Sequence, residues 1–247
     1  MNSRNYKSQV RILLQILPII SKQTDLALHG GTAINLFQLN MPRLSVDIDL
    51  TYLPVEDRDT SLTNIDKILS EIKQSIEHAF PEFMIAHKKQ ESKLIISSTE
   101  AFIKVEVNQI KRGCYANPKR ITLCSKAQLE FNSFCQIQIV EIGHLYGGKI
   151  CAALDRQHPR DLFDINYMLK KVKFSSTIKK GFLFYLISSN RPIKEMLFPL
   201  LKDQEDALEN QFQGMSEQKF TYEDYIETKE KLIFEVQQSL TSSDKEF

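Results

Sequence analysis

The sequence predicts an α/β protein, with a mixed sheet and helices over residues 1–140 and a helical part over residues 141–247. Two observations predict this division. Short runs of alternating or continuous apolar residues, typical of strands, recur before residue 141 and are missing after residue 165. Apolar residues at helical spacing occur in both parts, so we expect helices to cover the sheet in the first part and to form the second part alone.

The expected elements of the first part begin with an amphipathic helix at 5–23, in which Pro18 would introduce a bend. A short helix at 32–39 and a longer one at 60–80 follow. Strands are expected at 26–28, around Asp47 and Asp49, and at 83–87, 94–98, 101–110 and 135–140. The second part contains helices that begin near residues 141 and 159, then helices at 177–188, 193–201 and 221–240, the last with Thr221 and Asp224 as capping residues.

The composition limits the class of protein. The chain has 247 residues, of which 42% are hydrophobic, enough for one large domain or two modest ones. Its 32 basic and 31 acidic residues give a net charge of +1, so a basic surface for nucleic acid must be local. The 4 cysteines form no C-x-x-C pair and no zinc-like pattern with histidine, which is typical of reduced thiols. No run approaches the ~18 apolar residues of a membrane span, so we expect a cytoplasmic protein without a membrane partner.

Residues 26–52 carry the strongest functional signal. A strand leads into Gly30-Gly31 and a helix, and a second strand then carries Asp47 and Asp49 on one face. Two neighbouring carboxylates repel one another unless a cation lies between them, which favours a divalent metal. The glycine turn at a helix start offers backbone N–H groups to phosphate oxygens. Alone, a Gly-Gly pair can be a simple turn and an Asp-x-Asp pair a solvated strand face, but together they favour a nucleotide site.

The motif GGTA from Gly30, followed by R-x-S-x-D-x-D-L from Arg43, resembles the opening signature of the DNA polymerase β-like nucleotidyltransferases. The phrasing LHGGTA…R-S-DIDL is most similar to the AbiEii/AbiGii toxin family, the nucleotidyltransferase toxins of abortive-infection and type IV toxin–antitoxin systems. One departure is the longer interval from the glycines to Asp47, which a helix and the Met41-Pro42 turn fill. The resemblance implies a nucleotidyltransferase domain over 1–140 with these nucleotide-binding residues: Gly30, Gly31, Thr32, Arg43 and Ser45.

Glu106 is the candidate third carboxylate. In residues 102–107 the apolar side chains face one side of the strand, while Lys104 and Glu106 face the other. The resemblance implies that Asp47, Asp49 and Glu106 together hold the metal. On the sequence alone, Glu106 could instead be solvated, as acids on edge strands commonly are, or be the surface ion-pair partner of Lys104.

Residues 111–126 are turn-rich and basic, with five lysine or arginine side chains and an interleaved Tyr115. Charge clusters of this kind usually lie on a solvated surface, so a loop is the favoured interpretation. A patch that follows the phosphates of an RNA substrate is the alternative.

A second motif, K…ALxR…PRDLFDI, begins at Lys149 and is again similar to the AbiEii family. Lys149 corresponds to the family lysine that reaches the nucleotide phosphates, a task that suits a mobile point charge on a long stem. Asp161 and Asp164 lie three residues apart on one helical face, and both fit the family aspartate motif. Either could orient Lys149 or an arginine. Asp161 could also cap the helix that begins after the break at Pro159.

The resemblance implies a transfer reaction with all six catalytic candidates: Asp47, Asp49, Glu106, Lys149, Asp161 and Asp164. The three strand carboxylates would hold one or two Mg²⁺ ions, and an acceptor hydroxyl would attack the α-phosphorus of a nucleoside triphosphate (NTP), releasing pyrophosphate. The resemblance also implies an RNA acceptor, tRNA above all, and a separately encoded antitoxin protein. We expect the active site in a cleft between the two parts.

Two other hypotheses stay open. The same scaffold could transfer the nucleotide to a protein hydroxyl or to a small molecule such as an aminoglycoside. The chain could also be a non-catalytic regulatory or interaction protein that has kept the fold. Against the second hypothesis, a degenerate copy has no reason to keep carboxylates that repel one another.

Overall fold

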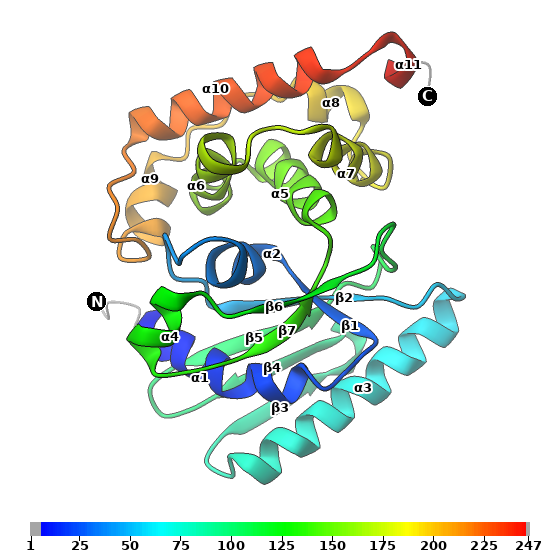
Figure 1. The fold of residues 1–247 in the computed structure, drawn as a ribbon, viewed down its shortest axis with the longest axis vertical. Helices are drawn as coiled ribbons and strands as arrows, with labels where there is room; N and C mark the ends of the chain where they lie inside the picture. Colours follow the sequence, from blue (N-terminus) through cyan, green and yellow to red (C-terminus); the bar gives the residue numbers. More distant parts are fainter. Residues whose placement is uncertain (1–5, 246–247) are drawn as a thin grey trace. The chain divides into compact units, whose positions relative to one another are not determined.

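The computed structural model describes residues 6–245, and its chain forms two compact units, Met1–Glu141 and Ile142–Phe247. Within the described residues, unit 1 contains all the strands and unit 2 is helical (Figure 1). This confirms the predicted α/β class with a helical second part. Asn5, where we expected the first helix to begin, lies outside the described residues.

Unit 1 is built on one sheet with the strand order β3-β4-β5-β2-β1-β7-β6. The sheet is mixed, because β1 runs parallel to β7 and β2 parallel to β5, whereas the other pairs are antiparallel. The strands are β1 (Leu26–His29), β2 (Asp47–Tyr52), β3 (Met84–Lys88), β4 (Lys93–Ser97), β5 (Phe102–Val107), β6 (Lys119–Thr122) and β7 (Gln136–Ile139). Since β5 lies between β4 and β2, the comparison of Glu106 with acids on edge strands was wrong.

Helices cover both faces of this sheet. α1 (Tyr6–Ile20) and α3 (Arg58–Ala79) pack against one face, and α2 (Gly30–Ala33) with the π-helix η1 (Ile34–Gln38) lies on the other (Figure 1). Pro18 lies inside α1, which continues to Ile20. The side chains that face α1 and α3 are apolar and buried, for example Leu94 on β4 and Val105 on β5. Burial of this face therefore holds the strands in register and leaves the alternate residues on the opposite face.

Residues 111–126 are not all loop, so that interpretation was wrong in part. Residues 119–122 form β6, which pairs antiparallel with β7, and α4 (Ser125–Phe131) begins shortly afterwards. The backbone of β7 provides the hydrogen-bond partners of β6, and no local pattern in such a short, polar strand reveals this.

Unit 2 consists of helices whose ends follow local sequence signals. Its elements are α5 (Ile142–Arg156), α6 (Pro159–Tyr167), η3 (Met168–Val172), α7 (Ser176–Ile187), α8 (Ile193–Leu197), α9 (Glu205–Ala207), η4 (Leu208–Phe212), α10 (Tyr222–Ser239) and α11 (Ser242–Lys245). The predicted capping box of Thr221 and Asp224 is confirmed. The helix expected at 193–201 ends at Leu197, because Phe198 precedes a proline and leaves the helical conformation.

The helices α5 and α7 approach at the level of their backbones. A Cβ atom on Gly147 would lie 2.2 Å from the carbonyl carbon of Gly181, and one on Gly181 would lie 1.8 Å from the carbonyl oxygen of Gly143. Neither position therefore has room for a side chain.

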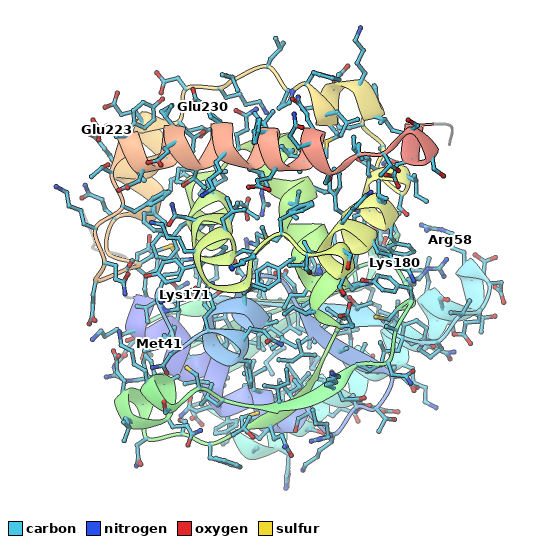
Figure 2. The ribbon with its side chains drawn as sticks, turned by 45° about the horizontal axis from the view of Figure 1, so that its top comes forward. Met41, Arg58, Lys171, Lys180, Glu223 and Glu230 are labelled. Atoms are coloured by element: carbon cyan, nitrogen blue, oxygen red, sulfur yellow. The ribbon has the colours of Figure 1, made fainter. Side chains whose placement is uncertain are left out.

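On α10, Glu223 and Glu230 both point to solvent (Figure 2). Within residues 6–245, no helix is both long and apolar enough to cross a bilayer.

Candidate functional site

The turn after β1 brings a glycine into contact with a carboxylate. Gly30 has a φ of +72°, a left-handed conformation that favours glycine. A Cβ atom at this position would lie 2.3 Å from Oδ2 of Asp49, so the Asp49 carboxylate lies directly against the glycine backbone. The sequence motif contains both Gly30 and Asp49 but does not show that they are in contact. The structure shows this contact.

The second glycine of the turn contacts two polar side chains. A Cβ atom on Gly31 would lie 2.8 Å from Nη2 of Arg43 and 3.0 Å from Oγ of Ser45. Arg43 is only 4% exposed, and its Nη1 donates a hydrogen bond to the Leu44 carbonyl at 2.9 Å. The guanidinium is therefore held beside the turn, where it adds a fixed positive charge.

Thr32 connects the turn to the start of β2. Its side chain is fully buried, and Oγ1 donates to the backbone oxygen of Asp47 at 2.5 Å and lies 3.0 Å from Oγ of Ser45. Asn35, one helical turn after Gly31, donates from Nδ2 to the Gly31 carbonyl at 3.0 Å. Because these bonds occupy the Thr32 hydroxyl, its contact with a nucleotide would have to come from the backbone N–H.

The strand register gathers the three predicted carboxylates on one face of the sheet. Asp49 on β2 lies opposite Glu106 on β5, and Asp47 lies opposite Lys104. Residues that pair across strands point to the same face, as do residues two apart on one strand. Asp47, Asp49 and Glu106 therefore share the face that also carries the glycine turn.

The Glu106 side chain is bound by a cation that the sequence analysis missed. Oε2 of Glu106 lies 3.2 Å from Nζ of Lys93 on β4, and the same ammonium lies 2.9 Å from Glu91. Hydrogen bonds to Glu91 and Glu106 raise the pKa of Lys93. Lys104, the partner that the sequence suggested, was therefore the wrong cation. Over residues 6–245, no three His, Cys, Asp or Glu side chains lie close enough to hold a metal together.

Unit 2 contains a second charged cluster, which is buried. Nζ of Lys149 lies 2.8 Å from Oδ1 of Asp161 and 3.0 Å from Oδ2 of Asp164. Asp161 also accepts hydrogen bonds from Nε and Nη2 of Arg156, the second at 3.0 Å. Both aspartates thus contact the lysine, and Asp161 contacts the arginine as well.

The alternative that Asp161 caps α6 was wrong. The N-cap of α6 is His158, whose Nδ1 accepts a hydrogen bond from the Arg160 backbone N–H at 3.1 Å. Burial acts to raise the pKa of Asp161, but the charges and hydrogen bonds of Lys149 and Arg156 outweigh it and hold this pKa far below its usual range. Asp161 is therefore ionised within a compensated cluster.

Tyr146 is a neighbour of this cluster that the sequence analysis did not consider. It lies one helical turn before Lys149 on α5, and its side chain is fully buried. Burial, with a contribution from the charge of Asp164, raises the pKa of Tyr146. Its hydroxyl has no hydrogen-bond partner among the described residues. The three-residue spacing to Lys149 was the one signal that could have pointed to it.

The mixed sheet, the glycine turn and the Asp47–Asp49 pair are the features of a nucleotidyltransferase, and comparisons with known proteins agree. The model of the family described as "Nucleotidyl transferase AbiEii toxin, Type IV TA system" matches residues 11–235. The chain therefore belongs to the AbiEii family of nucleotidyltransferase toxins of type IV toxin–antitoxin systems.

Two solved structures share the fold. The nucleotidyltransferase toxin MenT4 from Mycobacterium tuberculosis H37Rv aligns over 98% of this chain and 86% of its own, with a TM-score of 0.73 and 14% identity. A putative nucleotidyltransferase from H. pylori aligns over 96% of this chain and 95% of its own, with a TM-score of 0.57 and 16% identity. No curated protein matches the sequence.

Proposed function

We propose that this enzyme transfers a nucleoside monophosphate from an NTP to an RNA acceptor, with tRNA as the first candidate, in a Mg²⁺-dependent reaction. The observation that carries the proposal is the position of Asp49. Its carboxylate lies against the Gly30 backbone, and the strand register places it between His29 on β1 and Glu106 on β5. A carboxylate beside a glycine turn suits a metal that shares oxygen ligands with nucleotide phosphates.

The residues present fit Mg²⁺. Sites for metal–nucleotide complexes commonly use one or two carboxylates, with water and phosphate oxygens as the remaining ligands. Asp47 and Asp49 provide two such carboxylates on one face, and Glu106, whose Oε2 lies 3.2 Å from Nζ of Lys93, would be the third. When bound, the ion would neutralise charge on the phosphates and lower the pKa of the acceptor hydroxyl.

The chain's own groups would position the triphosphate. The Gly30 and Gly31 backbone N–H groups would bind phosphate oxygens, and Arg43 beside the turn would compensate their charge. We assign Lys149 to the triphosphate as well, on the basis of the family motif. Asp161 and Asp164 then act as positioning residues, since both hold the lysine ammonium. Weaker NTP binding by Lys149→Ala in titration calorimetry, at a temperature where circular dichroism shows the variant to be folded, would support this role, and unchanged binding would remove it.

The test of the proposal is a transfer assay with defined acceptors. The enzyme is incubated with Mg²⁺ and each of the NTPs, labelled at the α-phosphate, and with bulk tRNA, total protein or an aminoglycoside in separate reactions. We expect label in tRNA with at least one NTP, and its loss on addition of EDTA. Label in protein or drug alone would replace the RNA acceptor with the corresponding alternative.

Asp49→Asn provides the variant for this assay. Because the substitution removes a metal ligand, we expect a loss of at least about 100-fold in transfer rate with the fold intact. Asp59→Asn is the matched control, an exposed carboxylate in the first turn of α3. Equal transfer by Asp49→Asn and the control would exclude the metal role.

The family also supports a partner, a separately encoded antitoxin protein. Expression of the wild-type chain would then stop cell growth, whereas Asp49→Asn would not. Co-expression of the antitoxin would restore growth. Growth arrest by the Asp49→Asn chain would separate toxicity from nucleotide transfer.

A further inference from the structure

We propose that the exposed face of β3, β4 and β5, termed here the acceptor face, binds a single-stranded end of the RNA acceptor next to Asp47 and Asp49. This inference rests on the proposed function and names the surface that would present the acceptor hydroxyl. The register of the strands, the exposure of two lysines and a phenylalanine, and the chemistry of single-stranded RNA carry it.

The strand register connects the acceptor face to the catalytic carboxylates in rows that cross the sheet. In the first row, Lys88 on β3 lies opposite Lys93 on β4, which lies opposite Glu106 on β5 and then Asp49 on β2. Paired residues point to the same face, so a continuous line of side chains leads from Lys88 to Asp49. At about 4.8 Å per strand, this line spans about 14 Å.

A second row brings another lysine beside Asp47. Ile95 on β4 lies opposite Lys104 on β5, and Lys104 lies opposite Asp47. The third row contains Phe102 on β5, two residues before Lys104 on the same face. Besides Glu106, the side chains that β5 places on this face are thus a lysine and an aromatic ring.

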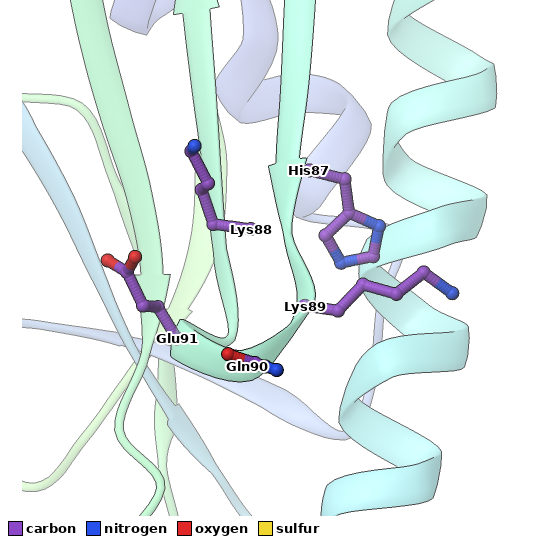
Figure 3. A pocket seen from close by; sticks show the side chains of 5 residues that line it. All are labelled: His87, Lys88, Lys89, Gln90 and Glu91. Carbon is purple, nitrogen blue, oxygen red and sulfur yellow. The ribbon is translucent and has the colours of Figure 1, made fainter.

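The acceptor face is the solvent side of these strands. On the opposite side, Leu94, Ile103 and Val105 are buried in the core beneath α1 and α3. Figure 3 shows the division at the end of β3, where His87 points toward α3 and Lys88 points away from it. His87 lies 3.2 Å from Asp66 of α3, so the packing of that side holds Lys88 on the acceptor face.

The chemistry of the acceptor face matches single-stranded nucleic acid. Phe102, the first residue of β5, is 52% exposed, so much of its ring is open to a ligand. Lys88 and Lys104 are exposed as well, whereas Lys93 is engaged by Glu91 and Glu106. Single-stranded RNA is bound by cations that contact phosphates and by aromatic rings that stack on bases. Met84 on β3, 72% exposed, lies in the same row as Phe102 and adds a second apolar side chain that could pack on a base. The exposed lysines beside these two side chains favour RNA over a protein partner, whose interface core is depleted of charged residues.

A rival RNA surface exists at the other edge of the sheet. Lys119 and Arg120 on β6 are exposed and belong to the basic stretch at 111–126. In the strand order, β2, β1 and β7 separate this edge from the acceptor face. Variants of the two surfaces therefore report on separate parts of the sheet.

The test measures RNA binding without catalysis, by fluorescence anisotropy of a short 5′-labelled single-stranded RNA as salt is varied. For the Lys88→Ala/Lys104→Ala variant we expect binding at least tenfold weaker at low salt. Its slope of log affinity against log salt should fall by about 1.4, since each phosphate contact contributes about 0.7. For Phe102→Ala we expect about tenfold weaker binding with an unchanged slope, because stacking releases no counterions.

Matched controls keep the test specific. Lys67→Ala changes an exposed lysine of α3, and Phe134→Ala changes a 70% exposed phenylalanine before β7. All variants should retain the wild-type melting temperature, because the changed side chains are exposed. Loss of binding from Lys119→Ala/Arg120→Ala instead, or equal affinity of all variants, would overturn the inference.

The outcome also separates this inference from the proposed function. Wild-type enzyme that transfers nucleotide to RNA and binds RNA, with acceptor-face variants that bind equally well, would overturn only the acceptor face. Wild-type enzyme that binds no RNA would overturn the acceptor face together with the RNA acceptor. In the transfer assay the variants should raise the KM for RNA more than they lower kcat, because the affected residues bind the acceptor.

Discussion

Each unit of the molecule contains a group of carboxylates, and the two groups differ in what compensates their charge. In unit 1, Asp47 and Asp49 are half-buried neighbours on one strand face, with Glu106 on the next strand. In unit 2, Asp161 and Asp164 are almost fully buried and contact Lys149. In the second group the chain itself supplies the cation, whereas for the first group we propose a metal ion.

The difference predicts how strongly substitutions in each group change stability. Carboxylates on a strand face gain nothing from proximity to one another, which supports the metal site proposed for Asp47 and Asp49. A buried ion-pair cluster, by contrast, is costly to break, because removal of one partner leaves an uncompensated charge. Substitutions of the unit 1 carboxylates should therefore affect activity with little loss of stability, whereas substitutions in the unit 2 cluster should lower stability in addition to any effect on NTP binding through Lys149.

The largest effect is expected in unit 2, from Lys149→Met. The substitution removes the ammonium that both buried aspartates contact and leaves Arg156 as the remaining cation of Asp161. We expect the free energy of unfolding to fall by about 3–5 kcal/mol. Chemical denaturation measures it.

The control for this variant is Lys171→Met, which changes an exposed lysine of η3 that is labelled in Figure 2. Its stability should stay within about 0.5 kcal/mol of the wild type. Equal stability of Lys149→Met and the wild type would show that the aspartates find another cation, and the contrast between the units would be lost.

Gly30→Ala tests the unit 1 group through the backbone. An alanine at a φ of +72° is strained, and its Cβ would lie 2.3 Å from Oδ2 of Asp49, which must then move. Displacement of a metal-binding carboxylate by about 1 Å can cost about 100-fold in rate. We expect this loss in the transfer assay, with about 1–2 kcal/mol of stability lost to strain.

Gly113→Ala is the matched control for backbone strain. Gly113 has a φ of +78°, but its Cβ would meet only Cγ2 of Val55, at 3.2 Å. Both variants should lose similar stability, and only Gly30→Ala should lose activity. Equal activity in the two variants would show that the glycine turn at Gly30 has no role in the reaction.

The pH dependence of stability should distinguish Asp161. Because the pKa of Asp161 is lowered in the folded protein, the unfolded chain takes up the proton first as the pH falls. Its contribution to stability is thus complete above an ordinary aspartate pKa of about 3.9 and declines below it. Urea denaturation from pH 6 to pH 3 should show a shallower decline in Asp161→Asn than in the wild type, and parallel curves would contradict the assignment.

The sequence predicted the parts of the site that depend on local pattern. Alternation in β2 places Asp47 and Asp49 on one face, and the order of motifs identified the family. The partners of each carboxylate depend on strand register and helix packing, which no local pattern contains. For this reason the sequence analysis missed Lys93 as the partner of Glu106. It also offered Asp161 as a possible cap of α6, whereas the cap is His158.

The smallest expected effect concerns the stability of Asp49→Asn. Like charges that face one another across strands destabilise a sheet, so neutralising Asp49 beside Asp47 and Glu106 should raise the free energy of unfolding by about 0.2–1 kcal/mol. Asp161→Asn should lower it, because Arg156 would lose this anion and Lys149 would lose one of the two aspartates that it contacts. Denaturation of both variants without Mg²⁺ measures whether each substitution raises or lowers the free energy of unfolding. If Asp49→Asn were destabilised as much as Asp161→Asn, the contacts of the Asp49 carboxylate within the chain would outweigh this repulsion, and the contrast between the two units would be lost.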